Sequence, residues 1–374
     1  MKGRFTFFLL VLSFASFAQQ EHYLLIGTYT SGKSEGIYVY KFNSENADNS
    51  FVSTARTSNP SFLAVSPDQQ FVYSVNEDSG GKKFPDGGGI TSFSFDAGKG
   101  SLTEINSRFS AGKDPCYVSI DKTGKWLFAG NYSSGSLGLF PINKNGSIDS
   151  VRQLIKHNGS GPDTSRQRSA HVHSTVLSND QQYLYVPDLG IDKVMIYRFS
   201  NKKGKLTAAP TPFVKSVPGS GPRHFETDHA NKYAYLMEEL SGTVSVLKIL
   251  PGKLQPIQRI SALSKDFKGL IGSADIHVSP DGKYLYCSNR GESNSITIFS
   301  INKLTGKLTF ITEQSTLGIQ PRNFNFDPSG NYLLVANQHT DEIVIFRINK
   351  QSGLLTDTNK RINVPSPVCI KWIR

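Results

Sequence analysis

The chain has 374 residues, a formal net charge of +11 and only three cysteines. Its lysines are scattered through turns instead of lining up with aromatic residues, which argues against a nucleic-acid interface, although the charge could still attract a small anionic substrate. An odd number of cysteines without CxxC spacing argues against a disulfide framework and a zinc site. We therefore expect Cys116, Cys287 and Cys369 to be isolated buried thiols.

The first residues are typical of an export signal. Lys2 and Arg4 precede an apolar run at residues 5–12, and small residues follow it. This pattern predicts a secretory signal peptide over residues 1–18, and hence a periplasmic or secreted protein. A retained anchor is the alternative, but the run is short for a membrane span of roughly 20 residues. No other segment is apolar enough for stable membrane insertion, and we expect residues 19–374 to form a single domain.

Downstream, the chain repeats a pattern of two short strands joined by a turn. The clearest copy, residues 273–291, reads SADIHVSPDGKYLYCSNRG. Its period-two alternation around a Pro-Asp-Gly turn predicts an antiparallel hairpin. Five other full copies begin at Pro60, Asp114, Ala170, Gly221 and Gln320. The polar residue that ends the second strand recurs after 55, 57, 50, 51 and 48 residues.

A further apolar strand follows each hairpin, as at residues 296–301, and most of these lead to a fourth strand. Four strands every roughly 40–50 residues is the period of a β-propeller blade. A seventh copy is split, because residues 23–29 match a second strand and residues 366–371 match a first strand. We therefore predict an all-β, seven-bladed β-propeller with four antiparallel strands per blade. Pairing of the N- and C-terminal strands in one blade closes the ring and leaves no open edge.

Equivalent positions in the hairpins should form rings on one face of the propeller, opposite the hairpin turns. The first-strand ring consists of Ser61, Cys116, His173, Arg223, Ala274 and Arg322. The second-strand ring consists of Tyr29, Glu77, Tyr132, Leu189, Glu239, Arg290 and Gln338. One half of these rings gathers a histidine, three arginines and a glutamate, which suits recognition of a phosphate or carboxylate. A simple salt bridge between blades, from Glu239 to Arg223 or Arg290, is the alternative.

The longest connections are expected on the same face as the rings. They are residues 78–89, 156–170 and 262–272, whereas the hairpin turns on the opposite face are short. Elaborated loops on one face of a rigid scaffold often carry binding residues. Arg166 and Arg168 in the second loop could therefore reach over the site, or they could remain solvated charges.

A series of short motifs, taken in order, resembles a known family. The motifs are Ala-His-Val-His at 170–173, Gly-Pro-Arg-His at 221–224, Glu-Glu-Leu at 238–240, Ala-Asp-Ile-His at 274–277, Asn-Arg-Gly at 289–291, Gln-Pro-Arg at 320–322 and Gln338. The chain resembles the seven-bladed propeller lactonases, which include a bacterial 6-phosphogluconolactonase and a fungal carboxy-muconate lactonizing enzyme. The resemblance covers essentially the whole mature chain. It implies hydrolysis or formation of a lactone ring on a small acidic substrate, without a metal or other cofactor.

The resemblance implies catalytic roles for four residues, which are His173, Arg223, Glu239 and Arg290. Their chemistry is compatible, because a histidine can transfer protons near neutral pH and arginines can stabilise an oxyanion. Glu239 could orient His173 or activate the attacking water. Substrate contacts are expected from Arg322, Gln338, His171, Asp275, His277, Glu77 and Tyr132.

Three of the expected substrate contacts have an alternative. His171 points the same way as His173 by period-two alternation but lies nearer the loop, so it could support the site without touching a substrate. Asp275 and His277 alternate away from the ring position at Ala274. Either of them could instead tie neighbouring blades together.

Two departures from the family pattern limit what the resemblance implies. Glu238 stands where Asn commonly precedes the catalytic Glu, and Asn179 replaces the Pro of the usual Ser-Pro-Asp turn. Because 6-phosphogluconolactone is a cytoplasmic metabolite, an exported homologue could open a different sugar or aldonic lactone. The alternatives to a monomeric lactonase are an exported binding scaffold without catalysis and a cyclase acting on an unsaturated dicarboxylate.

Overall fold

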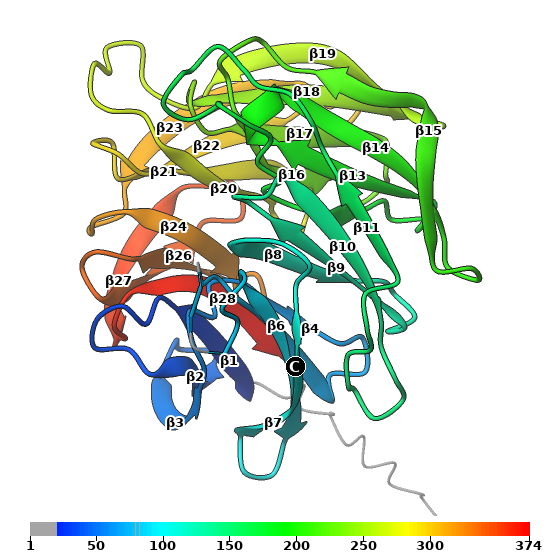
Figure 1. The fold of residues 1–374 in the computed structure, drawn as a ribbon. Coiled ribbons are helices and arrows are strands. Elements are labelled where there is room, and N and C mark those ends of the chain that lie inside the picture. Colours follow the sequence, from blue (N-terminus) through cyan, green and yellow to red (C-terminus); the bar gives the residue numbers. More distant parts are fainter. Residues whose placement is uncertain (1–20, 79, 82) are drawn as a thin grey trace, which may run out of the picture.

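The computed structural model describes residues 21–78, 80–81 and 83–374, so the expected signal peptide at 1–18 lies outside the described residues. Within the described residues, 28 strands form seven four-stranded antiparallel sheets, which are arranged as the blades of a ring (Figure 1). The prediction of a seven-bladed propeller is therefore confirmed.

The strands of the first three blades are given in order from the channel to the rim. Blade 1 consists of β28 (Pro367–Ile373), β1 (Glu21–Thr28), β2 (Gly36–Asn43) and β3 (Asn49–Arg56). Blade 2 consists of β4 (Leu63–Val65), β5 (Phe71–Asn76), β6 (Gly89–Asp96) and β7 (Ser101–Phe109). Blade 3 consists of β8 (Pro115–Ile120), β9 (Trp126–Asn131), β10 (Ser136–Pro141) and β11 (Gln153–Lys156).

The remaining blades have the same arrangement. Blade 4 consists of β12 (Val176–Leu177), β13 (Tyr183–Asp188), β14 (Lys193–Ser200) and β15 (Lys205–Lys215), with a short 3-10 helix, η1 (Leu189–Ile191), after β13. Blade 5 consists of β16 (Pro222–Thr227), β17 (Tyr233–Glu238), β18 (Thr243–Leu250) and β19 (Lys253–Ser261). Blade 6 consists of β20 (Ser273–Val278), β21 (Tyr284–Asn289), β22 (Ser295–Ile301) and β23 (Leu308–Ser315). Blade 7 consists of β24 (Pro321–Phe326), β25 (Tyr332–Asn337), β26 (Glu342–Ile348) and β27 (Leu355–Asn363).

The two ends of the chain close the ring as predicted. β1 and β28 pair antiparallel, with Leu25 opposite Lys371 and Ile26 opposite Ile370, and the blue and red strands lie side by side in Figure 1. The inner strands of neighbouring blades also contact one another, β24 against β28 and β28 against β4. Blade 1 therefore depends on contacts between residues more than 300 positions apart in the sequence.

The hairpin predicted at residues 273–291 is formed by β20 and β21. Ile276 pairs with Cys287 and Val278 pairs with Leu285, which is the register that the alternation predicts. Gly282 in the turn has a φ of 70°, a left-handed conformation that glycine adopts without a steric penalty. The turn residues thus fix the register of the strands on either side.

Blade 4 differs from the prediction at its innermost strand. Only two residues form β12, and a single bridge joins Val172 to Asp188 upstream of it, so His173 lies outside a regular strand. The His173 N–H donates to Pro187 O at 3.1 Å. An antiparallel pair of this kind normally exchanges two hydrogen bonds, but proline has no N–H to return the second one. Only one of the two hydrogen bonds can therefore form beside His173.

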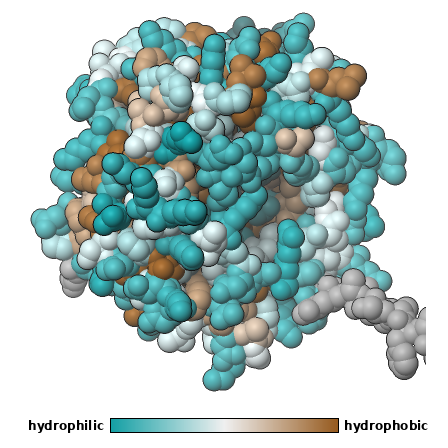
Figure 2. Space-filling view, turned by 90° about the vertical axis from the view of Figure 1, so that its right-hand side faces the viewer, coloured by the Kyte–Doolittle hydropathy of each residue, from teal (hydrophilic) through white to brown (hydrophobic). Residues whose placement is uncertain are grey.

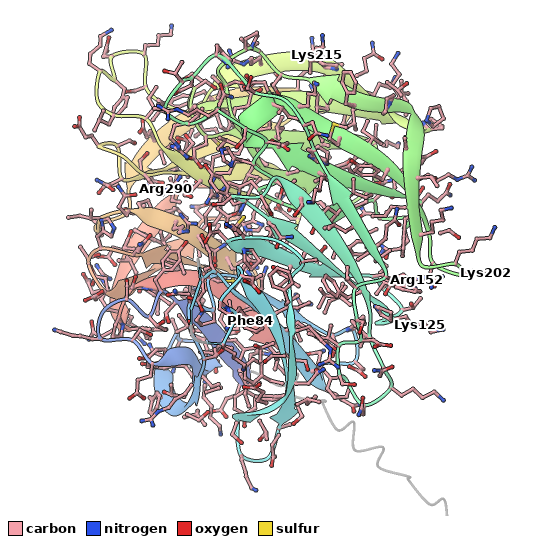
Figure 3. All side chains as sticks on the ribbon, viewed as in Figure 1. Phe84, Lys125, Arg152, Lys202, Lys215 and Arg290 are labelled. Atoms are coloured by element: carbon pink, nitrogen blue, oxygen red, sulfur yellow. The ribbon has the colours of Figure 1, made fainter. Side chains whose placement is uncertain are left out.

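Apolar side chains fill the space between blades, and the surface is mostly polar. One cluster of fully buried residues contains Leu63, Val72 and Ile90. The face shown in Figure 2 is mainly hydrophilic, with apolar side chains scattered singly or in small groups. Figure 3 shows Lys125 and Lys202 on one side of the molecule and Arg290 on the other. No helix among the described residues is both long and apolar enough to cross a membrane.

The three cysteines are free and buried, as expected from their spacing. Each belongs to a strand of a different blade, Cys116 to β8, Cys287 to β21 and Cys369 to β28. Burial raises the pKa of all three thiols above their ordinary value. They therefore remain protonated near neutral pH and act as packing groups.

Candidate active site

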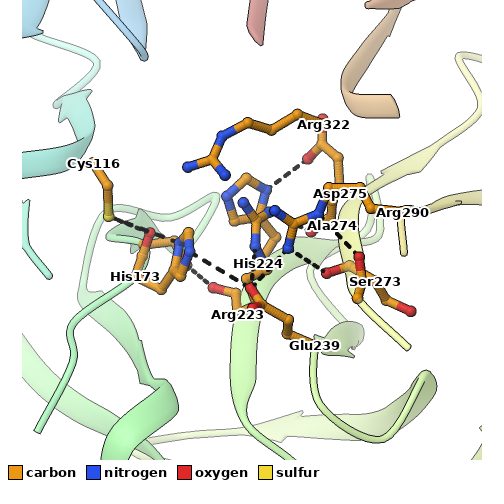
Figure 4. Close-up of polar contacts among 12 residues, drawn as sticks. Cys116, His173, Arg223, His224, Glu239, Ser273, Ala274, Asp275, Arg290 and Arg322 are labelled. Carbon is orange, nitrogen blue, oxygen red and sulfur yellow. Dashed lines mark hydrogen bonds and ion pairs between the residues drawn. The ribbon is translucent and has the colours of Figure 1, made fainter. Parts of the chain in front are cut away.

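The structure brings together His173, Arg223, Glu239 and Arg290 in one polar cluster at the loop face of the channel (Figure 4). Glu239 is the common partner. Its Oε2 lies 2.8 Å from Arg223 Nε, 3.1 Å from Arg290 Nη2 and 3.9 Å from His173 Nε2. Arg223 comes from β16, whereas Glu239 and Arg290 directly follow β17 and β21. Three adjacent blades therefore supply the cluster, from equivalent hairpin positions.

The other oxygen of Glu239 is held by the long loop before blade 4. Arg166 Nη2 lies 2.6 Å from Glu239 Oε1 and 3.2 Å from the hydroxyl of Tyr132. Burial by itself raises the pKa of Glu239, but the charges of Arg290, Arg223 and Arg166 outweigh burial and lower the pKa to about 2. The carboxylate is therefore ionised across the physiological pH range.

His173 is buried and uncharged at neutral pH. Burial, followed by the charges of Arg223 and other cationic neighbours, lowers the pKa of His173 well below 6.5. Its contact with Glu239 is therefore not an ion pair in the free protein. Its Nδ1 lies 3.8 Å from the Sγ of Cys116, while its Nε2 faces Glu239. A neutral imidazole in this position can accept a proton, and Glu239 is close enough to stabilise the imidazolium that results.

Backbone carbonyls fix two of the arginines. Arg223 donates to Ala274 O at 2.6 Å, and Arg290 donates from Nε to Gly272 O at 2.9 Å. Burial and the neighbouring arginines lower the pKa of Arg290 to about 9 despite the opposing effect of Glu239, which still leaves it cationic at pH 7. Both guanidinium groups are thus held in place before any substrate arrives, as an oxyanion site requires.

Arg322 and Glu77 form the opposite wall of the cluster. Arg322 packs 5.3 Å from the ring centroid of Tyr29, and its Nη2 lies 4.0 Å from Glu77 Oε1. Glu77 also accepts hydrogen bonds from the hydroxyls of Tyr29 and Ser61, and burial raises its pKa. Across the whole cluster, four arginines face two carboxylates, so positive charge is in excess.

Tyr132 and His171 line the side of the cluster next to His173. The rings of Tyr132 and His171 stack at 4.4 Å, and Tyr132 meets His173 edge-on at 5.5 Å. His171 Nδ1 lies 3.0 Å from Tyr132 O, an arrangement that fits the supporting alternative for His171. Gln338 is partly buried, and its side chain makes no hydrogen bond to another described residue.

Asp275 and His277 lie deeper in the channel than the other expected substrate contacts. Asp275 binds His224 Nδ1 at 2.7 Å and His277 Nε2 at 3.1 Å, and it also accepts from the side chain of Asn323. His277 lines an opening of about 640 Å³ on the hairpin-turn face, together with Glu226. This geometry fits the alternative that Asp275 ties blades 5, 6 and 7 together.

A small chamber of about 10 Å³ lies directly beneath the cluster. Its walls include Ser61, Cys116, His173, Arg223 and Arg322, five of the six residues in the first-strand ring. These five residues therefore lie together, as their equivalent positions in the hairpins predict. The chamber has room for about a single water molecule and is too small for a sugar.

The two departures from the family pattern have local explanations. Glu238 is fully buried and binds Arg259 Nε at 2.8 Å and Thr243 Oγ1 at 2.5 Å, so its charge is balanced within blade 5. Asn179 donates to Asp228 O at 3.0 Å, which links the turns of blades 4 and 5. Among the described residues, neither side chain forms a hydrogen bond or ion pair with the side chain of Glu239.

Sequence reasoning identified Arg166 only as one of two possible loop residues and did not place His224 in the site. The structure separates Arg166 from Arg168, because Arg168 Nε donates to Thr164 O at 2.6 Å on its own loop. His224 packs edge-on to His173, with 5.5 Å between the ring centroids. Its position next to Arg223 in the Gly-Pro-Arg-His motif is the sequence feature that could have indicated this. Among the described residues, no group of three or more His, Cys, Asp or Glu side chains is placed to hold a metal ion.

Comparison with known proteins assigns the chain to a family. Residues 23–372 match the family described as lactonase, 7-bladed beta-propeller. The chain is 36% identical to a 6-phosphogluconolactonase of Bacillus subtilis, over 93% of this chain and 97% of that protein. It is 40% identical to a 6-phosphogluconolactonase of Formosa agariphila, over 89% of this chain and 94% of that protein.

A solved structure agrees with the sequence relatives. The structure of the Pseudomonas aeruginosa periplasmic gluconolactonase aligns with a TM-score of 0.91 and 38% identity, covering 95% of this chain and 99% of that one. The similarity extends over the whole ring and is not limited to a few blades. The chain therefore belongs to the seven-bladed β-propeller lactonase family.

Proposed function

We propose that this protein hydrolyses a small sugar lactone, with a preference for one that carries a phosphate or carboxylate group. The observation that carries the proposal is the convergence of His173, Arg223 and Arg290 on the carboxylate of Glu239. The names of the three relatives support the same reaction class, and two of them are named for a phosphorylated lactone. The excess of arginine over carboxylate supports an anionic substrate.

In the proposed reaction, a water molecule lies between His173 Nε2 and the lactone carbonyl carbon. The neutral imidazole accepts a proton from the water as its oxygen attacks the carbonyl carbon, and Glu239 stabilises the imidazolium. Arg223 and Arg290 donate hydrogen bonds to the oxyanion that forms. When the ring C–O bond breaks, the imidazolium returns the proton to the ring oxygen, which gives the open-chain hydroxy acid. Arg322 and Tyr132 lie where they can contact the hydroxyl or anionic groups of the sugar.

We also propose that the protein works outside the cytoplasm. The composition of residues 1–18 supports export, and the structural relative from Pseudomonas aeruginosa is described as periplasmic. An extracytoplasmic enzyme would meet sugar lactones that carry a carboxylate more readily than phosphorylated intermediates of central metabolism. Cell fractionation with an antibody to the chain tests this location, and a wholly cytoplasmic signal would contradict it.

The direct test is a pH-stat screen of the purified protein against glucono-, galactono- and 6-phosphoglucono-lactones. Heat-inactivated protein at the same concentration gives the rate of spontaneous opening. We expect at least one lactone to open faster than this background, with the same rate in the presence of EDTA. If every lactone opens at the background rate, the proposal is wrong and a binding scaffold becomes the better interpretation.

A further inference from the structure

The loop before blade 4 presents one arginine to the site from a firmly anchored backbone. Gln167 is fully buried, and its side-chain amide donates to Leu189 O and Asp192 Oδ1, both at 2.8 Å. The N–H groups of Ser165 and Arg166 both donate to Asp163 Oδ1. The backbone on either side of Arg166 is therefore fixed, and the freedom that remains belongs to its side chain.

Arg166 differs from the other two arginines that bind Glu239. Its side chain is 42% exposed, compared with 1% for Arg223 and 13% for Arg290. Arg223 and Arg290 also donate to backbone carbonyls, which hold them where they are. The guanidinium of Arg166 contacts only two side chains, Glu239 and Tyr132, among the described residues. Of the three, Arg166 can leave Glu239 at the lowest cost.

Arg166 also occupies the oxygen of Glu239 that Arg223 and Arg290 leave free. Oε2 is shared by Arg223 and Arg290, whereas Oε1 binds Arg166 alone among the described residues. A carboxylate saturated by three guanidinium groups is a poor acceptor for further hydrogen bonds and a weak base. A ligand that removes Arg166 from Oε1 would therefore make Glu239 more basic while leaving it anchored through Oε2.

We propose that Arg166 is an exchangeable clamp that holds Glu239 in the free enzyme and transfers to the phosphate or carboxylate of the incoming lactone. This proposal rests on the proposed function of the site and specifies how the site selects its substrate. A guanidinium binds phosphate and carboxylate through two parallel hydrogen bonds, so the substrate offers Arg166 a partner equivalent to the one it gives up. The exchange couples recognition of the anionic group to release of Glu239 Oε1.

The matched control lies on the same loop. Arg168 is exposed, carries the same charge and donates to Thr164 O instead of to the cluster. Arg166→Gln and Arg168→Gln therefore remove the same charge from the same segment, and only Arg166→Gln removes the clamp. Arg166→Lys keeps the charge but loses the two-pronged geometry, so it should give an intermediate result.

The test measures kcat/KM for 6-phosphoglucono-lactone and for glucono-lactone in each variant. The selectivity is kcat/KM for 6-phosphoglucono-lactone divided by kcat/KM for glucono-lactone. We expect Arg166→Gln to lower this ratio about tenfold or more, mostly by raising KM for the phosphorylated lactone. Arg168→Gln should keep the ratio of the wild type. A ratio that is the same in Arg166→Gln and the wild type would overturn the proposal, because a merely structural role changes both lactones together.

A second readout separates failure of the clamp from failure of the lactonase. Binding of inorganic phosphate is measured by the shift in melting temperature, which needs no turnover. If the wild type opens no lactone but phosphate stabilises it and Arg168→Gln more than Arg166→Gln, the clamp stands and the reaction class is wrong. Equal stabilisation of all variants contradicts the clamp, whatever the activity assay shows.

Discussion

At the scale of single residues, the site is defined by how its charges are compensated. Glu239 is almost fully buried and remains ionised because three arginines surround it. His173 lies beside the same arginines but carries no compensating anion closer than 3.9 Å, so it remains neutral. Two titratable groups in one pocket thus have different protonation behaviour, which is the arrangement that acid–base catalysis requires.

The lowered pKa of His173 predicts the acid limb of the pH profile. The proposed mechanism needs a neutral imidazole, and a pKa below 6.5 keeps His173 neutral as the pH falls through that value. We therefore expect kcat/KM to hold its plateau to a pH below 6.5. The profile should be measured from pH 4 to pH 8 after subtracting spontaneous lactone opening. An acid limb centred at or above pH 6.5 would contradict the assignment of His173 as the base.

Removing the imidazole gives a second prediction at this scale. His173→Asn keeps a polar side chain of similar bulk but cannot accept a proton at neutral pH. We expect kcat to fall about 10²–10⁴-fold, the usual contribution of general base catalysis. Far-ultraviolet circular dichroism should match the wild type, because His173 lies outside the regular ladder. Activity within a few-fold of the wild type would mean that another group takes the proton.

At the scale of the elements, the inner strands carry a second polar network below the cluster around Glu239. β20 contributes Asp275, which joins His224 of β16 to Asn323 of β24. His277 on the same strand binds Asp275 and approaches Glu226 at 3.7 Å. This network connects three blades at the channel and supports the arginines above it, since Arg223 and His224 are consecutive residues.

The His277 contact predicts a loss of stability at alkaline pH. Burial alone would lower the pKa of His277, but Asp275 and Glu226 outweigh it and raise the pKa to about 10. Because this pKa is raised, the ion pair of His277 contributes fully to the free energy of unfolding below pH 6.5, and this contribution is lost as the pH rises toward 10. The free energy of unfolding should therefore fall more between pH 7 and pH 10 in the wild type than in His277→Gln. Equal losses in the two proteins would contradict this assignment.

At the scale of the whole molecule, the fold and the geometry of the cluster both depend on closing the ring. The cluster draws its residues from separate blades, so its geometry requires all of them to hold their places. β28 provides this closure through Val368, Cys369 and Ile370, which are almost fully buried against neighbouring blades. A defect at the C-terminal strand therefore affects the site, although of the described residues of β28 only Val368 lines the chamber beneath the cluster.

A core substitution in β28 tests the contribution of closure. Ile370 is fully buried, so Ile370→Ala should lower the free energy of unfolding by about 2–5 kcal/mol. Leu304 is 88% exposed, and Leu304→Ala should change the free energy by less than about 0.5 kcal/mol. Chemical denaturation monitored by tryptophan fluorescence measures both. Similar values for the two variants would show that β28 contributes little to stability.

The sequence predicts the ring better than the details of the site, for physical reasons that particular residues illustrate. Period-two alternation and short polar turns, such as Pro-Asp-Gly at 280–282, determine the hairpins. Equivalent positions then place His173, Arg223, Glu239 and Arg290 together. The innermost strand of blade 4 is short and leaves His173 outside the ladder, which alternation does not predict. The ion pair of Glu238 depends on Arg259, a residue two strands away. The position of Arg166 depends on the path of a long loop, which alternation does not constrain.

The central claim is that Glu239 organises a site that opens lactones, and one comparison tests it most directly. Glu239→Gln removes the charge on which the arginines converge, while Glu342→Gln alters a carboxylate on β26 that pairs with Arg361 at 3.8 Å, away from the channel. We predict that lactone opening falls to the heat-inactivated background in Glu239→Gln and is retained in Glu342→Gln, with both proteins folded by circular dichroism. Wild-type rates in a folded Glu239→Gln protein would contradict the account.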